Sequence, residues 1–336
     1  MADAHTPEPP TATSRPRTWV RWLKIALRVL ILAVVTWGIW KTIVKANVEM
    51  AAHEFQWRQV HSGWLVLTGL LYLIGVAPCG IFWHRALWAM GQRPTWRESM
   101  RAFWIGHLGK YVPGKAMVVI LRTGLVFSDR VNRTVAVTSV FIETLTMMAV
   151  GAFVAAASLM LTSENPTLMW LALGLMLASG VPTWPPLFRR VVRWLQLHRM
   201  NPQIDDALRG VDGRLMGFGW TIISLGWVML GLSLWATMRA LDVGELQIGP
   251  LWQELPLLTA TVGLAMVAGF LSLIPGGFGV RDWVLMTLLE PHYGARVALV
   301  SAILLRIVWL LSELLVSAIL YLDVVRVRRQ ASPGVS

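Results

Sequence analysis

Two lysines flank a break of glycine and proline in the first half of the chain. Lys110 and Lys115 belong to the stretch Gly109–Lys115, which satisfies the phosphate-binding pattern G-x-x-x-x-G-K. A nucleotide-binding loop also needs Ser or Thr after its lysine and lies between a strand and a helix, whereas Ala116 follows Lys115 between two apolar stretches. Nucleotide hydrolysis is therefore excluded. Because an ammonium group at membrane depth needs water or an anion, both lysines are expected to face an anionic partner.

A second break lies in the C-terminal half and precedes a helix expected from Val280. Backbone amides at such a helix start, together with the positive end of the helix dipole, predict an anion site. The amides belong to Gly276, Gly277 and Gly279. Arg281 could add a charge-assisted bond to phosphate, and Asp282 suits the first turn of the helix. The alternative is that Asp282 only caps the helix and that Arg281 pairs with it.

Four ionisable residues interrupt apolar helical stretches, where charges usually face the bundle interior and mark a substrate or proton path. They are Arg122, Glu143, Arg306 and Glu313. We expect Glu143 and Arg306 to pair, with Glu313 two turns further along the face of Arg306. The pair could also serve only to lock the two halves together, and Arg122 could only extend to the cytoplasmic surface.

The sequence offers no recognisable enzymatic constellation. The histidines have no spaced Cys, His or carboxylate partners that resemble a metal site, and no nucleophile–base arrangement stands out. We therefore expect no catalytic residue, no metal and no cofactor.

Composition places these residues in a membrane protein. Apolar residues make up 56% of the chain and charged residues only 14%, and the mean hydropathy is +0.59. The net charge of +12 would suit nucleic acid, but the basic residues gather in short loops beside apolar segments, where they set membrane orientation and meet anionic lipid head groups. The stretch Arg189–His198 suits an amphipathic helix on such a surface, although an ordinary charged loop fits equally well.

Hydrophobic runs predict an all-α polytopic protein with about six spanning helices. They are expected at about 25–44, 63–83, 134–161, 167–185, 217–238 and 296–322. A transmembrane domain would cover 21–328, between cytoplasmic tails at 1–20 and 329–336. Every strongly basic loop then falls on one side, which predicts an inner-membrane protein with both termini in the cytoplasm.

Two further segments, 97–127 and 255–290, are apolar stretches broken at their centres, and each is expected to form a helical hairpin. We expect both hairpins to be re-entrant, which the basic residues at both ends of the first favour, although fully spanning hairpins stay open as the alternative. Irregular backbone at membrane depth implies a polar cavity. The segments 63–161 and 217–322 form two inverted halves, each with one hairpin, which is the sequence pattern of a transporter site at the midplane. The alternative is two unrelated Gly-rich hairpins.

At these motifs the sequence resembles the flippase-like family that includes the transmembrane region of lysylphosphatidylglycerol synthase. The matching elements are Gly109-Lys110-x-x-Pro113-Gly114-Lys115, Arg122, Glu143, the stretch from Pro275 to Asp282, and Arg306, within roughly residues 20–328. The family commonly has Glu where Asp282 stands, and a basic residue and an aspartate where Thr144 and Met147 stand. The family's lipid specificity is therefore not carried over.

The resemblance implies a lipid-translocating domain. Because the chain stops soon after Arg329, it is similar to the stand-alone members and is not expected to make aminoacylated lipid. The expected substrate is a membrane phospholipid or a polyprenyl-linked lipid. The alternatives are a secondary transporter of a small soluble anion, a lipid-modifying enzyme and a scaffold protein. Oligomeric state does not follow from the sequence.

Overall fold

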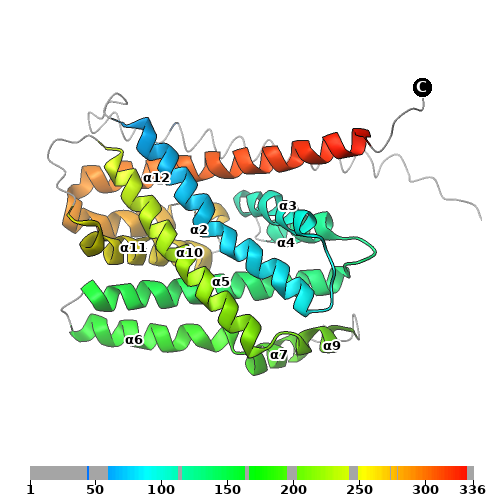
Figure 1. Cartoon of the computed structure of the whole chain (residues 1–336). Coiled ribbons are helices and arrows are strands. Elements are labelled where there is room, and N and C mark those ends of the chain that lie inside the picture. Colours follow the sequence, from blue (N-terminus) through cyan, green and yellow to red (C-terminus); the bar gives the residue numbers. More distant parts are fainter. Residues whose placement is uncertain are drawn as a thin grey trace, which may run out of the picture. The chain divides into compact units, whose positions relative to one another are not determined.

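The computed structural model describes residues 44, 60–112, 116–162, 166–194, 203–241, 249–272, 274–277 and 279–330. The helix predicted at 25–44, apart from its last residue, lies outside this part, as do Lys115 and the tail 1–20. The described elements are the helices α2 (Ser62–Ala89), α3 (Trp96–His107), α4 (Ala116–Val126), α5 (Arg133–Thr162), α6 (Pro166–Gly180), α7 (Pro185–Trp194), α9 (Gln203–Arg209), α10 (Gly213–Arg239), α11 (Leu251–Leu271) and α12 (Val280–Gln330), and the 3₁₀ turns η2 (Leu108–Tyr111), η3 (Val181–Thr183) and η4 (Pro275–Gly277) (Figure 1).

The chain is an all-α polytopic membrane protein. Among the described residues, five helices are long and apolar enough to cross a membrane: α2, α5, α10, α11 and α12. Four contain predicted spans, whereas α11 was expected only as a hairpin arm. The span predicted at 167–185 is shorter, because α6 has 15 residues and gives way to η3 at Val181. Such a helix is only about 23 Å long, against a hydrocarbon core of about 30 Å.

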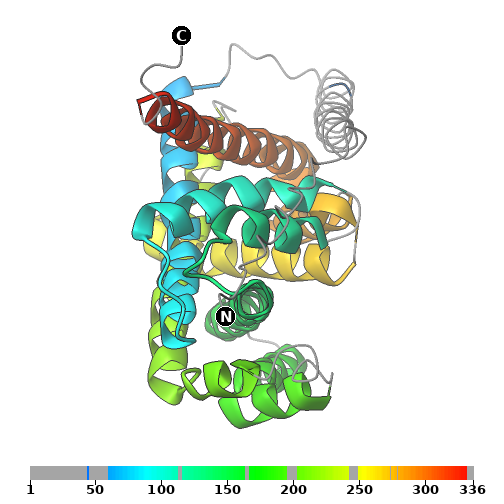
Figure 2. The same cartoon turned by 90° about the vertical axis from the view of Figure 1, so that its right-hand side faces the viewer.

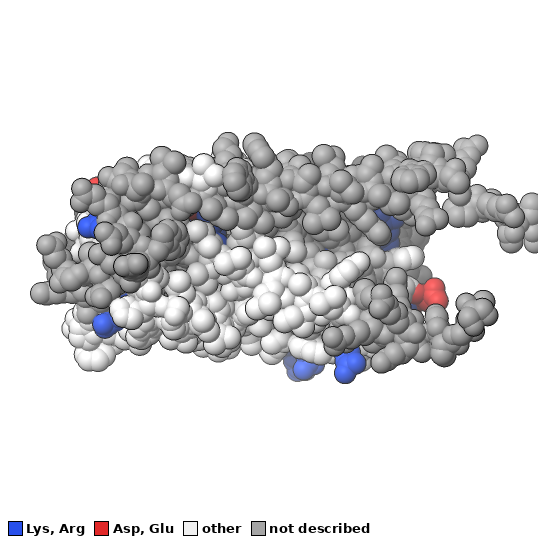
Figure 3. All heavy atoms as spheres, turned by 90° about the horizontal axis from the view of Figure 1, so that it is seen from above, with Lys and Arg blue, Asp and Glu red and all other residues white. Residues whose placement is uncertain are grey.

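The outer faces of these helices suit lipid. Val66, Leu70 and Ile74 recur every four residues along α2 and are more than half exposed, as are Leu311 and Leu315 on α12. The described part of the face seen in Figure 3 is largely uncharged, with its Lys, Arg, Asp and Glu mostly toward the margins. Large apolar side chains exposed in such rows indicate contact with the bilayer rather than with water.

Helices α2 and α10 cross near the middle of their lengths, and glycines set how closely they approach. A Cβ atom added to Gly226 of α10 would lie 2.4 Å from the carbonyl oxygen of Gly75 in α2. Small residues at a crossing let two backbones pack closely, which is how membrane helices gain contact energy without a hydrophobic driving force. Next to this crossing, the buried indole of Trp227 donates to the Met147 carbonyl of α5.

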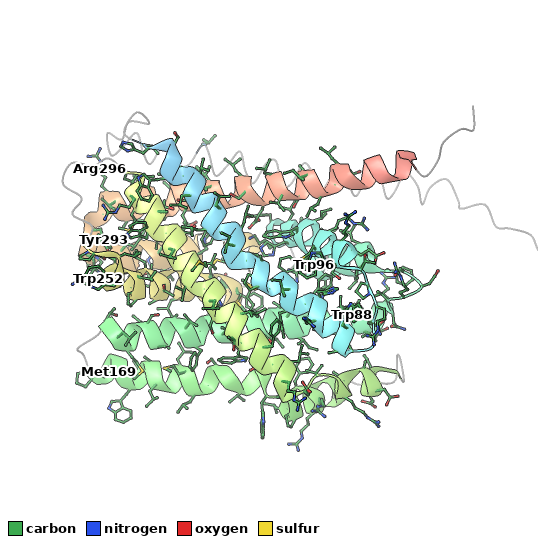
Figure 4. The ribbon with its side chains drawn as sticks, viewed as in Figure 1. Trp88, Trp96, Met169, Trp252, Tyr293 and Arg296 are labelled. Atoms are coloured by element: carbon green, nitrogen blue, oxygen red, sulfur yellow. The ribbon has the colours of Figure 1, made fainter. Side chains whose placement is uncertain are left out.

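The helix ends fall into two groups. At one end, which we call the basic end, the backbone N–H of Arg93 donates to the carbonyl of Arg130, so the α2–α3 and α4–α5 loops meet. At the opposite end, the N–H of His61 donates to the carbonyl of Ala240. Figure 4 shows Trp88 and Trp96 toward the basic end and Trp252 and Tyr293 at the opposite one, as aromatic belts at two membrane interfaces require.

Two hairpins enter this framework. In the first, α3 and α4 lie side by side and are joined through η2 (Figure 2). Its α3 begins with a reciprocal cap, in which Thr95 and Glu98 each accept the other's backbone N–H. The second hairpin consists of α11, η4 and the first part of α12, which bends at Gly294, where φ is 79°. Both segments were predicted to be broken helical hairpins, and both are.

Candidate functional site

The tips of the two hairpins meet. Turn η2 contacts η4, and a Cβ atom added to Gly276 would lie 3.2 Å from Cδ1 of Tyr111. Gly276 and Gly277 have φ angles of 60° and 65°, a left-handed conformation that glycine adopts readily. The glycines therefore both turn the chain and let an aromatic ring lie directly against the second tip.

Beside this contact, Lys110 and Glu313 form a buried ion pair. Nζ of Lys110 donates to Oε1 of Glu313 at 2.5 Å, and the Tyr72 hydroxyl donates to the same oxygen. Nζ also lies 3.0 Å from Nε2 of His107, and because an ammonium group only donates, this ring nitrogen accepts. The Glu313 side chain is fully buried, and its second oxygen, Oε2, has no hydrogen-bond partner.

Arg281 joins this group through two aromatic rings. Its guanidinium lies 5.2 Å from the centroid of the Trp309 ring, which stacks on Tyr72 at 4.4 Å. The Arg281 side chain is 9% exposed. Its Nε and Nη2 have no hydrogen-bond partner, while Nη1 contacts the sulfur of Met266 at 3.8 Å. Arg281 is thus a buried cation between the Trp309 ring and the Asp282 carboxylate, which lies 3.9 Å from Nε and beyond hydrogen-bond distance.

Asp282 pairs with Arg306. Nη1 of Arg306 donates to Oδ2 of Asp282 at 2.5 Å, while Nε of Arg281 stays 3.9 Å from Oδ1. The same Asp282 oxygen accepts the backbone N–H of Gly279 at 3.3 Å. Asp282 therefore caps α12 and binds Arg306, and it does not hydrogen-bond to Arg281.

The predicted Glu143–Arg306 pair is wrong. Oε2 of Glu143 accepts from Nη1 of Arg122 at 2.5 Å, in a pair that is 3% and 2% exposed. The Arg122 guanidinium also lies 4.3 Å from the Phe103 ring centroid. The reason is topological: α4 packs on α5, which brings Arg122 to Glu143, and the bend at Gly294 folds α12 back so that Arg306 reaches Asp282. Arg122 is therefore a buried partner rather than a surface-directed cation.

Two of the three backbone amides of the predicted anion site are already hydrogen-bonded to other groups of the protein. The N–H of Gly277 donates to the carbonyl of Ile274 at 3.0 Å, and that of Gly279 to Asp282. Those two amides are not the unpaired donors that the sequence suggested. The unpaired donors of the second tip belong instead to the Arg281 side chain.

The structure thus brings together Lys110, Arg281, Asp282, Arg306 and Glu313, with Gly276 at their edge, and keeps Arg122 and Glu143 as a separate pair. We call the set Tyr72, His107, Lys110, Arg281, Asp282, Arg306 and Glu313 the central polar cluster. Sequence reasoning missed Tyr72 and His107, and also the aromatic neighbours Tyr111 and Trp309. One signal was present: the chain has only four tyrosines, and Tyr72 lies within the apolar run of α2.

Comparison with known families identifies one that covers most of the chain. A family model described as the lysylphosphatidylglycerol synthase TM region matches residues 22–317. No curated protein matches the chain significantly.

Proposed function

The chain belongs to the family of the lysylphosphatidylglycerol synthase transmembrane region, and from this premise we propose that it moves a lipid or lipid-linked head group across the membrane. The family supports a role in lipid handling. The finer proposal of translocation, rather than covalent chemistry, rests on the site: its charged residues lie where two broken helices meet, among apolar spanning helices.

That observation carries the proposal because ionised groups inside a membrane protein are costly and usually mark a substrate path. Lys110, Arg281 and Arg306 converge from three different segments on the junction between η2 and η4. Discontinuous helices that meet in this way bind substrates near the midplane of many transporters.

The dimensions of the first hairpin support a re-entrant arrangement. Helices α3 and α4 have 12 and 11 residues and would be about 18 Å and 17 Å long, well short of a bilayer core of about 30 Å. The hairpin as a whole begins and ends at the basic end, where Arg93 meets Arg130.

The second hairpin approaches from the opposite end. The Tyr293 hydroxyl at its exit donates to Glu254 at its entrance, so both of its ends lie together. Although α11 alone is long enough to cross the core, its partner arm bends away at Gly294. We propose that the hairpins are opposed re-entrant elements of an inverted repeat, 63–161 and 217–322, whose tips meet at depth.

In this mechanism the head group passes the central polar cluster while its acyl or prenyl chains stay in the bilayer. The head group would reach the cluster through Lys110 and Asp282, because their side chains are 22% and 25% exposed whereas Glu313 is fully buried. Separation of Tyr111 from Gly276 would open the passage between the two tips.

The orientation follows from charge. Exposed arginines crowd the basic end, including Arg85, Arg93, Arg97 and Arg130, whereas Arg239 and Arg296 are the basic residues described near the opposite end. We propose that the basic end is cytoplasmic in an inner membrane, by the positive-inside rule. There α7, which is helical over Pro185–Trp194, would meet anionic head groups.

The test is translocation by purified protein in liposomes. A tail-labelled fluorescent phospholipid is incorporated into both leaflets, and a membrane-impermeant quencher reports how fast inner lipid reaches the outer leaflet. Wild type should accelerate exchange, Arg306→Gln should slow it at least tenfold, and Arg209→Gln should match wild type, since Arg209 is 80% exposed in a surface pair. Equal rates in all three proteins and in empty liposomes would refute translocation.

A further inference from the structure

We propose that head-group movement is coupled to a proton, which Glu313 carries in the same direction as the head group. This inference rests on the proposed function and names its energy source. Three features of the central polar cluster carry it: the full burial of Glu313, the kind of cation that neutralises this carboxylate, and the position of His107 beside the pair.

Three carboxylates in the part of the chain that the structure describes form ion pairs inside the helix bundle. Two of them have an arginine as partner: Glu143 binds Arg122, and Asp282 binds Arg306. A guanidinium group stays ionised in proteins. Asp282 also caps α12 through the N–H of Gly279. These two carboxylates are therefore held in the ionised form.

The third carboxylate, Glu313, is neutralised by a lysine at a hairpin tip. An ammonium group is a point charge on a flexible four-carbon stem, so it can leave a carboxylate while the backbone stays in place. The Lys110 side chain is 22% exposed, whereas that of Glu313 is fully buried. Lys110 can therefore turn toward an anionic group of the head group, and Glu313 cannot follow it.

Departure of Lys110 changes what is stable at Glu313. A buried carboxylate without its cation is strongly disfavoured, and such a group becomes neutral by binding a proton. Oε2 of Glu313 has no hydrogen-bond partner, so a proton binds there without breaking a bond. The proton comes from water on the side to which the cluster is open, and it leaves to water on the other side when Lys110 returns.

His107 is placed to pass this proton. Its Nε2 lies 3.6 Å from Oε1 of Glu313 and 3.0 Å from Nζ of Lys110. Because Nε2 accepts from Lys110, departure of the lysine frees the nitrogen to bind a proton near neutral pH. The other charged or titratable side chains that interact electrostatically with this group are Tyr72 of α2, Tyr111 of η2, and Arg281 and Arg306 of α12. Tyrosine and arginine keep their charge state near neutral pH, which leaves Glu313 and His107 to exchange the proton.

Competition for Lys110 sets the sign of the pH dependence. Protonation of Glu313 releases Lys110 for the head group, and head-group binding favours protonation by the same factor. Affinity for the head group therefore rises as pH falls, by at most about tenfold per pH unit for one proton. A pH gradient then drives the head group from the acidic side to the less acidic side.

Proteoliposomes that carry a pH gradient test this coupling. The probe is tail-labelled phosphatidylglycerol, and an impermeant quencher reports the leaflet in which it accumulates beyond the background of empty liposomes. With a gradient of about one pH unit, wild type should enrich the lipid up to about tenfold on the less acidic side, and a proton ionophore should abolish the enrichment. Glu313→Gln, which resembles the protonated carboxyl, should give no enrichment, whereas Arg209→Gln should retain it.

Proton binding can also be measured without transport. Short-chain phosphatidylglycerol is added to the detergent-solubilised protein in weak buffer, and a pH-sensitive dye reports protons taken up on binding. Wild type and His107→Gln should take up protons, and Glu313→Gln should not. Uptake that is lost in His107→Gln but kept in Glu313→Gln would overturn the assignment to Glu313.

Failure of the coupling differs from failure of the proposed function. Lipid exchange by wild type without enrichment under the gradient would overturn the inference and leave the proposed function intact. Proton uptake on binding without any lipid exchange would contradict the proposed function alone. Should Glu313→Gln fail to fold, the affinity of wild type decides: an affinity that does not rise as pH falls would overturn the inference.

Discussion

Lys110 and Glu313 are joined by a hydrogen bond of 2.5 Å across 203 positions of sequence. The bond connects the tip of the first hairpin to α12, so two segments far apart in the sequence meet in the central polar cluster. Because Glu313 also accepts from Tyr72, the pair ties the hairpin to α2 as well.

Removal of one partner of this pair should be costly. Lys110→Met leaves the fully buried Glu313 carboxylate without its cation, and we expect a loss of about 3–5 kcal/mol in unfolding free energy. The double variant Lys110→Met/Glu313→Leu should recover most of that loss, since neither charge then remains unpaired. Denaturant titration in detergent measures both values, and losses that simply add would argue against the pair.

The Arg122–Glu143 pair should stabilise the packing of α4 on α5 and should not bind the head group. Arg122→Leu and Glu143→Leu should each destabilise strongly, and together they should approach wild-type stability, because the pair is enclosed by Phe103 and Trp83. The folded double variant should still move lipid with wild-type head-group preference. An altered preference would return Glu143 to the substrate path.

The contact between the tips predicts that a side chain added at Gly276 lowers stability for two separate reasons. Gly276→Ala meets Tyr111 at 3.2 Å and also strains a residue whose φ is 60°, so we expect a loss of about 1–2 kcal/mol from the left-handed backbone, in addition to the steric cost. Tyr111→Ala should relieve only the steric part. Thermal unfolding of the two single variants and of the double variant separates the steric cost from the backbone cost. If Tyr111→Ala restored the whole stability lost in Gly276→Ala, backbone strain would be excluded.

The α2–α10 crossing offers a matched pair of glycine substitutions on one helix. Gly226→Ala would place a methyl group 2.4 Å from the Gly75 carbonyl, whereas a Cβ atom at Gly217 has no neighbour within 4 Å. Gly226→Ala should push the helices apart and lower stability by about 1–3 kcal/mol, as overpacking does. Gly217→Ala should be neutral or stabilising by up to about 1 kcal/mol. Equal melting temperatures for the two variants would contradict the observed close approach.

The cap of α3 predicts a pH effect at the basic end. Burial raises the pKa of Glu98, but the hydrogen bonds with Thr95 and the charges of Arg130 and Arg101 outweigh it and hold that pKa below its usual range. A lowered folded-state pKa gives stability that is present above the unfolded value of about 4.3 and is lost as pH falls through the folded value. Glu98→Gln keeps the capping geometry but cannot titrate, so its melting temperature should fall less at acidic pH than that of the wild type. The same pH dependence of the melting temperature in both proteins would contradict this prediction.

Much of the fold can be predicted from the sequence because membrane-spanning helices are recognisable by their length and apolar composition. The spans expected at 63–83, 134–161 and 217–238 lie within α2, α5 and α10, and the hairpin breaks fall where glycine and proline cluster. Helix ends are less predictable: α12 runs on to Gln330 beyond an expected end at 322, since the charged turns of a helix leaving the membrane carry no apolar signal.

The site was predictable in its residues but not in its pairing. Lys110, Arg281, Asp282, Arg306 and Glu313 stand out as charges near breaks or in apolar runs. Their partners depend on how helices fold back. Pro291 and Gly294 mark a break between the segments expected at 255–290 and 296–322, but they do not indicate that the bend brings Arg306 to Asp282. Tyr72 and His107 carry no obligatory charge, so only the fold assigns them to the cluster.

The central claim is that the substrate is a lipid, and the most direct measurement compares one head group with and without its chains. Wild-type protein is reconstituted into liposomes that contain tail-labelled phosphatidylglycerol and entrapped radiolabelled glycerophosphate. We predict that the lipid exchanges between leaflets while glycerophosphate stays trapped. Release of glycerophosphate without lipid exchange would contradict the account and identify a transporter of soluble anions.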